Sequence, residues 1–134
     1  MIDMETEIFN HVSRKAREKF PNLFMVGEYV KSPSSFPCVS LVEADNATFR
    51  NSQTSDGKEN HAAVMYEVNA YSNKIKAKKA ECKEIMAFID ELLAELNFTR
   101  IMLEPIPNQD DATVYRMLGR YRAVISKNKT IHRR

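Results

Sequence analysis

Three arginines in the C-terminal third suggest the clearest binding chemistry in this chain. Arg116, Arg120 and Arg122 occupy even-numbered positions of an apolar-rich run, so a β-strand would place all three on one face. The other face would carry Tyr115, Met117, Gly119, Tyr121, Ala123 and Ile125. A buried guanidinium needs partners, so the arginine face must meet water, carboxylates or phosphate groups.

This arginine face has two interpretations. If it lines a channel, it attracts DNA phosphates without reading bases, and the attraction weakens with salt. If it lies in a subunit interface, it meets acidic groups such as those at 90–95 or the pair Asp110 and Asp111. Tyr115 and Tyr121 fall on the opposite face, so we expect no stacking on bases and no base-specific recognition.

Residues that could support catalysis are scattered along the chain. His11, His61 and His132 are expected on a helix, in a polar loop and in the tail, without metal-ligand spacing on one element. Asp56, Glu59 and His61 could bind a cation, but a solvated loop is the better interpretation. The three glycines stand too far apart to form a phosphate-binding loop.

Three acids, Glu43, Glu67 and Glu104, are expected on strands, where small nucleases hold a divalent metal. The lysine that would follow a strand acid by two residues and activate water is missing. Pairing of these acids with the arginines of the last strand is the better interpretation. We therefore predict that the chain is not an enzyme and has no cofactor or metal site.

Length and charge distribution indicate one domain with an uneven surface. A chain of 134 residues fits a single domain, 1–134, and 43% hydrophobic residues suffice for a core. Residues 1–115 carry 13 basic and 18 acidic side chains, whereas the last nineteen residues carry seven basic and no acidic ones. This asymmetry indicates contact with a polyanion or with an acidic patch on a neighbouring subunit, although a soluble basic tail at 127–134 explains it equally well.

Cysteine usage and the start of the chain indicate a protein that is made and used in solution. Cys38 and Cys82 stand among apolar residues, which predicts two reduced core thiols of a cytosolic product. The first residues lack the features of a secretory signal, and no apolar run reaches the roughly twenty residues of a membrane span. We expect no membrane association.

Hydrophobic periodicity predicts two helices and five strands. The helices are expected over 2–19 and from Ser72 or Asn73 to about Leu96, with Asn97 as a C-terminal cap, and the strands over 23–30, 36–43, 63–71, 98–104 and 113–126. Glu5 is the only polar residue in the apolar stripe of the first helix. Short connections favour a mostly antiparallel sheet. We predict an α+β two-layer sandwich in the order α-β-β-β-α-β-β, with both helices on one sheet face and the other face partly open.

The second predicted helix carries its charges in an unusual order. Its first turns are expected to hold Lys74, Lys76, Lys78 and Lys79, and its end holds Asp90, Glu91 and Glu95. This order opposes the helix dipole, at a cost of roughly 0.3–1 kcal/mol for each exposed charge in a terminal turn. Solvent can screen these charges, but the same order suits a ring in which one end of each copy faces the opposite end of the next.

A long polar segment, 45–61, separates the second and third predicted strands. Phe49 is the only large apolar residue in it. A loop of this length in a compact domain is either disordered or functional. We expect a flexible loop that orders between neighbouring molecules during assembly, with candidate contacts at Arg50, Asp56, Lys58 and Glu59.

The sharpest motifs lie between Arg100 and Arg122. They are Met102-Leu103-Glu104-Pro105-x-Pro107-Asn108, Ala112-Thr113-x-Tyr115-Arg116 and Gly119-Arg120-Tyr121. With the chain length, the element order and the polar loop before the third strand, they resemble small head–tail proteins of long-tailed phages that infect Gram-positive bacteria. This family comprises tail terminator, tail completion and minor capsid proteins. The resemblance brings no catalytic motif.

The resemblance implies a hexameric ring that caps the finished tail tube and joins it to the DNA-filled head. The implied partners are other copies of the chain, the tail-tube protein, a head-completion or connector protein and, without sequence specificity, the DNA passing through the ring. The implied location is the virion, after assembly in the host cytoplasm. The alternatives are a head-completion or connector protein, another minor capsid or prophage structural protein, and a non-specific DNA-binding module.

Overall fold

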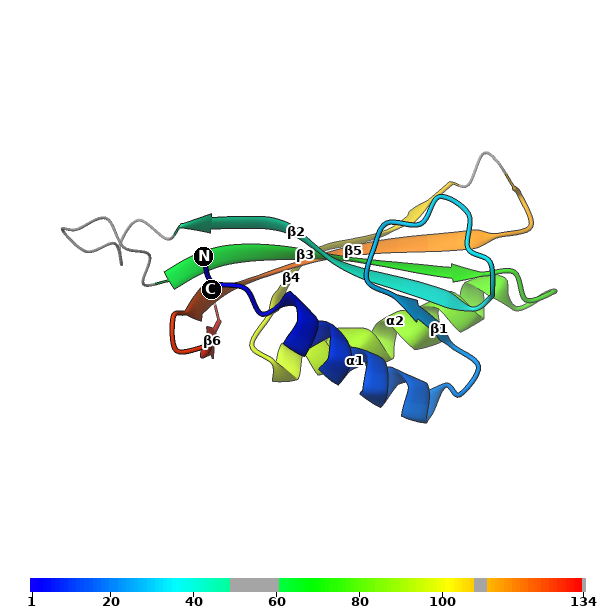
Figure 1. The fold of residues 1–134 in the computed structure, drawn as a ribbon. Helices are drawn as coiled ribbons and strands as arrows, with labels where there is room; N and C mark the ends of the chain where they lie inside the picture. The colour runs from blue at the N-terminus through cyan, green and yellow to red at the C-terminus, as the bar shows by residue number, and fades with distance from the viewer. Residues whose placement is uncertain (49–60, 108–110, 134) are drawn as a thin grey trace.

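The computed structural model describes residues 1–48, 61–107 and 111–133. Its elements are α1 (Glu5–Lys19), β1 (Phe24–Val26), β2 (Cys38–Thr48), β3 (His61–Ser72), α2 (Lys78–Glu95), β4 (Thr99–Ile106), β5 (Tyr115–Ser126) and β6 (Ile131–His132). The strands form one sheet in the order β1-β2-β3-β5-β4, and β6 pairs with β5. Both helices lie on one face of this sheet (Figure 1). The predicted α+β fold is confirmed.

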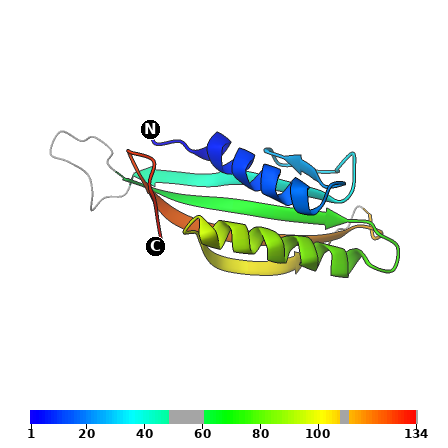
Figure 2. The ribbon, with the colours of Figure 1, turned by 90° about the horizontal axis from the view of Figure 1, so that it is seen from below.

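The two helices lie beside each other because each buries one apolar stripe against the sheet (Figure 2). The stripes are Ile8, Val12 and Ala16 in α1, and Cys82, Ile85, Met86, Ile89, Leu92 and Leu93 in α2. Both repeat at helical spacing. Tyr66 of β3 and Tyr121 of β5 are the largest side chains that the sheet contributes to this core. The residues of β5 that face the helices therefore agree with the predicted alternation.

β1 departs from the predicted pattern. The prediction of a strand over 23–30 was wrong beyond Val26, where β1 ends, and β1 pairs with β2 in parallel. The other strand pairs are antiparallel, so the sheet is mixed. A parallel pair requires a connection that crosses the sheet, and residues 27–37 provide it.

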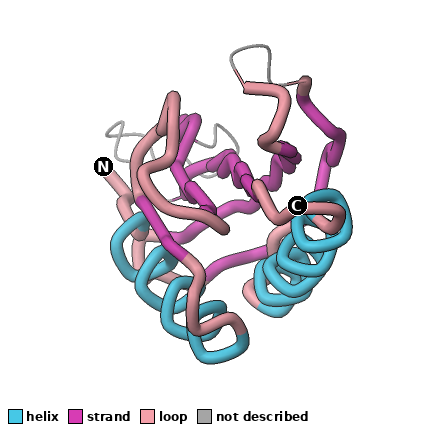
Figure 3. The backbone as a smooth tube through the Cα atoms, turned by 90° about the vertical axis from the view of Figure 1, so that its right-hand side faces the viewer, coloured by secondary structure: helices cyan, strands magenta, loops and turns pink. Residues whose placement is uncertain are grey.

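The segment 27–37 passes over the sheet face opposite the helices, as Figures 1 and 3 show. The Tyr29 hydroxyl donates a hydrogen bond to Glu67 Oε2 (3.0 Å), and the Tyr71 hydroxyl donates one to the Val30 carbonyl (3.1 Å). These contacts tie the segment to β3, which explains why the chain does not continue as a strand. The face that was predicted to be partly open is therefore covered near the end of β3.

β2 and β3 are longer than predicted, at the expense of the predicted loop 45–61. β2 continues to Thr48 and β3 starts at His61. The residues of β2 beyond a bulge at Glu43 and Asp45 are largely exposed, so their polar composition resembles that of a loop although they pair with β3. The candidate assembly contacts Arg50, Asp56, Lys58 and Glu59 lie outside the described residues.

α2 begins at Lys78, which is later than the predicted start after Ser72 or Asn73. The reason is that Ser72 still belongs to β3, where its hydroxyl donates a hydrogen bond to Glu81 Oε1 (2.6 Å) and accepts the Lys74 N–H (3.2 Å). Ser72 thus stabilises a turn that precedes the helix instead of capping the helix itself.

The C-terminal end of α2 agrees with the prediction. Asn97 has a φ of 67°, a left-handed conformation that asparagine tolerates. Its N–H donates to the Ala94 carbonyl (3.0 Å), and the N–H of Phe98 donates to the Leu93 carbonyl (2.9 Å). This Schellman arrangement ends the helix and directs the chain into β4.

The predicted basic tail, 127–134, is partly built into the sheet. Its residues Ile131–His132 form β6, which pairs with Val124 and Ile125 of β5. An ion pair between Lys129 Nζ and Glu7 Oε1 (2.7 Å) links the turn before β6 to α1. A strand of two residues has no detectable periodicity, so the sequence indicated only a tail.

Candidate functional site

The three arginines of β5 lie on the sheet face opposite the helices, as predicted, but their partners differ. Arg120 is opposite Glu67 in the β3–β5 register, and its Nε donates to Glu67 Oε1 (3.0 Å). Arg116 donates from Nε and Nη2 to Asn69 Oδ1 (2.9 and 2.8 Å). Arg122 is exposed, and its side chain has neither a hydrogen-bond nor an ion-pair partner among the described residues.

Glu67 is the central acceptor of this face. Its two carboxylate oxygens accept hydrogen bonds from Tyr29 and Arg120, and its side chain is 15% exposed against 43% for Arg120. The interpretation that strand acids pair with the arginines is therefore confirmed for Glu67. It is wrong for Glu43, which lies opposite the core residue Tyr66 and therefore faces the helices, and for Glu104, whose side chain has no ion-pair partner among the described residues.

Arg116 is held on two sides. Besides its bonds to Asn69, its guanidinium lies 5.5 Å from the centre of the Tyr71 ring, within the range of a cation–π contact. Asn69 is 1% exposed, so this interaction is largely shielded from water. The side chains of two of the three candidate arginines thus make polar contacts inside the chain, whereas that of Arg122 makes none with the described residues.

The predicted basic beginning of α2 is divided between the helix and the turn before it. Lys78 and Lys79 stand in the first helical turn, whereas Lys74 and Lys76 precede the helix, which corrects their predicted helical placement. The cause is the position of Ser72 at the end of β3. Lys78 Nζ donates to the Ala112 carbonyl (2.8 Å), and the side chains of the other three lysines have no hydrogen-bond or ion-pair partner among the described residues.

The acidic end of α2 follows the prediction. Its last turn contains no basic residue, and Glu91 and Glu95 are exposed. Asp90 differs from them because its Oδ1 accepts hydrogen bonds from the Tyr121 hydroxyl (2.8 Å) and from Arg100 Nη1 (3.4 Å). Asp90 therefore supports the fold, and the other two acids remain available to a partner.

A polar cluster at the start of α1 was not predicted. Glu5 Oε2 accepts the Glu43 N–H (2.7 Å), and Asn46 Nδ2 donates to the Ile2 carbonyl (2.7 Å). Burial raises the pKa of Glu43, and the nearby Glu5 raises it further. Glu43 Oε1 and the Tyr66 hydroxyl are buried without hydrogen-bond partners among the described residues. Glu5, a polar residue within an apolar stripe, was the one sequence signal of this cluster.

Two histidines come together beside β5, and both cysteines are buried. His61 and His132 were expected in the polar loop and in the tail, but their ring centres lie 5.7 Å apart because β3 and β6 flank β5. No group of three or more metal-binding side chains occurs among the described residues. Burial raises the pKa of the Cys38 thiol to about 11 and that of Cys82 to about 12, so both stay protonated at neutral pH.

In the described ranges, neither helix has the length and apolar character that crossing a bilayer requires. Neither a comparison with protein-family models nor one with curated proteins finds a match for this chain.

Proposed function

We propose that this chain is a structural subunit of the phage head–tail junction, a tail terminator that forms a ring on the tail tube and joins it to the head. The resemblance of residues 100–122 to that family motivates the proposal. In the structure this segment forms β4, β5 and their connection, which include the arginine face.

The observation that carries the proposal is the separation of charge along α2. Exposed lysines stand at and before its first turn, and exposed glutamates stand in its last turns. An 18-residue helix is about 27 Å long, so the two ends cannot meet within one chain. They can meet between chains, and a head-to-tail contact of this kind closes into a ring when its rotation permits.

Contact with DNA inside such a ring would be independent of sequence. Arg116 and Arg120 are engaged by Asn69 and Glu67, which leaves Arg122 and the lysines near α2 to meet phosphates. We therefore propose a weak, salt-dependent attraction to passing DNA and no base readout.

The test combines the purified chain with tail-tube protein and with tails that lack their terminator. Light scattering and negative-stain microscopy should show rings of uniform diameter, and added protein should cap the tubes and make tails competent to join heads. A head-completion protein would instead bind DNA-filled heads and ignore free tubes. A monomer that neither caps tubes nor binds heads would refute the proposal.

A further inference from the structure

The turn between β3 and α2 holds an apolar side chain in water on a fixed backbone. Ile75 is 88% exposed. The Ala77 N–H donates to the Lys74 carbonyl (3.2 Å), which closes a β-turn whose third residue, Lys76, has a φ of 64°. Glycine and asparagine adopt this conformation far more readily than lysine. Ser72 fixes the same turn through its hydrogen bonds to Lys74 and Glu81.

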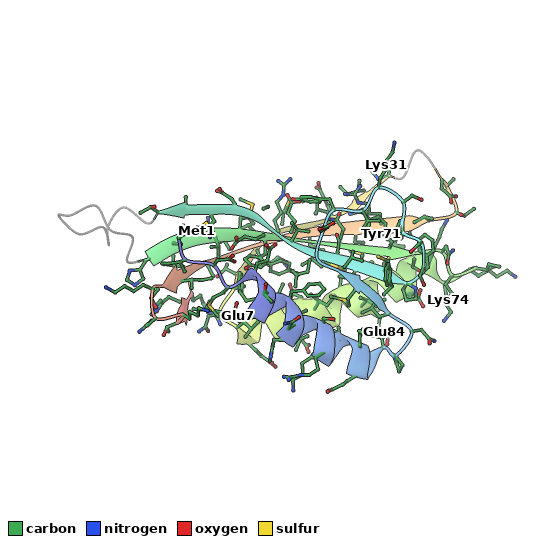
Figure 4. The ribbon with its side chains drawn as sticks, in the orientation of Figure 1. Met1, Glu7, Lys31, Tyr71, Lys74 and Glu84 are labelled. Carbon is green, nitrogen blue, oxygen red and sulfur yellow. The ribbon has the colours of Figure 1, made fainter. Side chains whose placement is uncertain are left out.

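Basic residues lie near this isoleucine in the sequence. The turn and the start of α2 carry Lys74, Lys76, Lys79 and Lys83, all partly or fully exposed. Figure 4 shows Lys74 at the end of the molecule where β3 leads into α2. We call Ile75 and these four lysines the basic knob. An exposed apolar residue alone is common, but one held on an unfavourable backbone and flanked by lysines has the composition of an interface anchor.

A complementary surface lies further along α2. Glu84, Phe88, Glu91 and Glu95 recur at helical spacing and form one stripe. Phe88 is partly exposed and packs edge-on against Phe20, with the ring centres 5.7 Å apart. The three glutamates are exposed, and none has a hydrogen-bond or ion-pair partner in the described part of the chain. We call these five residues the acidic patch.

Ile75 cannot reach the Phe20–Phe88 pair of its own chain. Phe88 is ten residues beyond the first residue of α2, about 15 Å along the helix axis, and Ile75 precedes that first residue. The patch is less acidic than its glutamates suggest, because Arg17 and Lys19 stand in the last turn of α1 beside Phe20. An apolar knob with a basic rim still fits an aromatic pair with an acidic rim in both charge and polarity.

We propose that the basic knob of one copy docks on the acidic patch of the next copy, in a head-to-tail contact. This inference rests on the proposed function and specifies the surfaces through which the copies associate. A nucleic acid is the less suitable occupant because it would use the lysines but leave Ile75 in water. Ile75 contacts the Phe20–Phe88 pair, and the charges around both surfaces set the orientation.

The test reverses charge on each surface separately. One variant carries Lys74→Glu, Lys76→Glu and Lys79→Glu, and the other carries Glu84→Lys, Glu91→Lys and Glu95→Lys. Sedimentation equilibrium should show that each variant self-associates at least about tenfold more weakly than the wild-type chain. An equimolar mixture should regain association, because alternating copies then present opposite charges at every contact. Circular dichroism checks that both variants are folded.

Matched controls separate the knob from general charge and hydrophobicity. Ile75→Ser should weaken self-association about tenfold, whereas Ile101→Ser, at another exposed isoleucine, should leave it unchanged. Replacing three exposed lysines elsewhere with glutamate should also leave self-association unchanged; these are Lys15, Lys31 and Lys127.

Two results would overturn the contact: a wild-type chain that stays monomeric at its highest soluble concentration, or variants whose mixture does not regain association. A chain that self-associates by these rules but neither caps tubes nor binds heads would uphold the contact and refute the phage role. Rings that form on tails regardless of these substitutions would uphold the phage role and refute the proposed contact.

Discussion

Tyr66 and Tyr121 provide a matched test of what a buried hydroxyl contributes to this fold. They are direct neighbours across the β3–β5 pair, and both are buried, with Tyr66 0% and Tyr121 1% exposed. The Tyr121 hydroxyl donates to Asp90 Oδ1 (2.8 Å), whereas the Tyr66 hydroxyl has no partner among the described residues. Replacing either tyrosine with phenylalanine removes the same atom, so the difference between the two variants reports the partner.

The expected magnitudes follow from these surroundings. A hydrogen bond to a charged acceptor contributes about 1.5–3 kcal/mol. The Asp90 side chain is 30% exposed and also contacts Arg100, so we expect Tyr121→Phe to lower the free energy of unfolding by about 1.5 kcal/mol. Tyr66→Phe removes a hydroxyl whose desolvation is not compensated, so it should leave the free energy of unfolding unchanged or raise it by up to about 1 kcal/mol.

Urea unfolding, monitored by circular dichroism, measures both changes, provided that the slope of the free energy of unfolding against urea concentration is the same in the wild type and the two variants. Thermal unfolding should give the same ranking, with about 3–5 °C for each kcal/mol at this chain length. An equal loss in the two variants, or a larger one for Tyr66→Phe, would refute the reasoning. That outcome would mean that the Tyr66 hydroxyl donates to Glu43 in solution and that this part of the core is fully satisfied.

Two further predictions concern Glu43 and Gly119. The raised pKa of Glu43 means that the folded state binds its proton more tightly than the unfolded state, so this residue's contribution is complete below its ordinary pKa of 4.5 and is lost as the pH rises through the folded value. Glu43→Gln should remove this pH-dependent loss of stability. Urea midpoints measured between about pH 4 and about pH 8 should therefore show that the stability of the variant increases relative to that of the wild type as the pH rises. A Cβ at Gly119 would lie 3.0 Å from Met86 Cε and from the Tyr121 ring. Because this contact is too close, Gly119→Ala should lower the free energy of unfolding by about 1 kcal/mol, as urea unfolding would measure. A more stable variant would contradict this and show that Met86 of α2 moves away at little cost.

Hydrophobic periodicity predicted the helices and strands that bury one face. It missed the segments whose structure depends on contacts with residues far away in the sequence. The stripe of α2 and the alternation of β5 are properties of consecutive residues, so both were visible in the sequence. The path of residues 27–37 depends on Tyr29 reaching Glu67 on another strand. β6 depends on pairing with β5. Neither contact leaves a local pattern, which is why a hairpin and a tail were predicted in their place.

The candidate site shows the same division. The arginine face of β5 and the acidic end of α2 could be predicted because charge and spacing define them. Pairing of Glu67 with an arginine of β5 was predicted, but the choice of Arg120 and the bond of Arg116 to Asn69 were not, since both follow from the register of β3 with β5. The exposure of Ile75 was hidden for a related reason, because the sequence placed the start of the helix before it instead of after it.

The pairing of Arg120 with Glu67 also decides how this face can meet DNA. Moving the Arg120 guanidinium to a phosphate would leave Glu67, whose side chain is 15% exposed and already accepts a bond from Tyr29, as an uncompensated anion beside another anion. The charge gained at the phosphate is thus largely cancelled by the charge released at Glu67. Arg122 carries no such penalty, because it has no partner among the described residues. Any attraction of the β5 face to DNA should therefore depend on Arg122 and leave the Arg120–Glu67 pair intact.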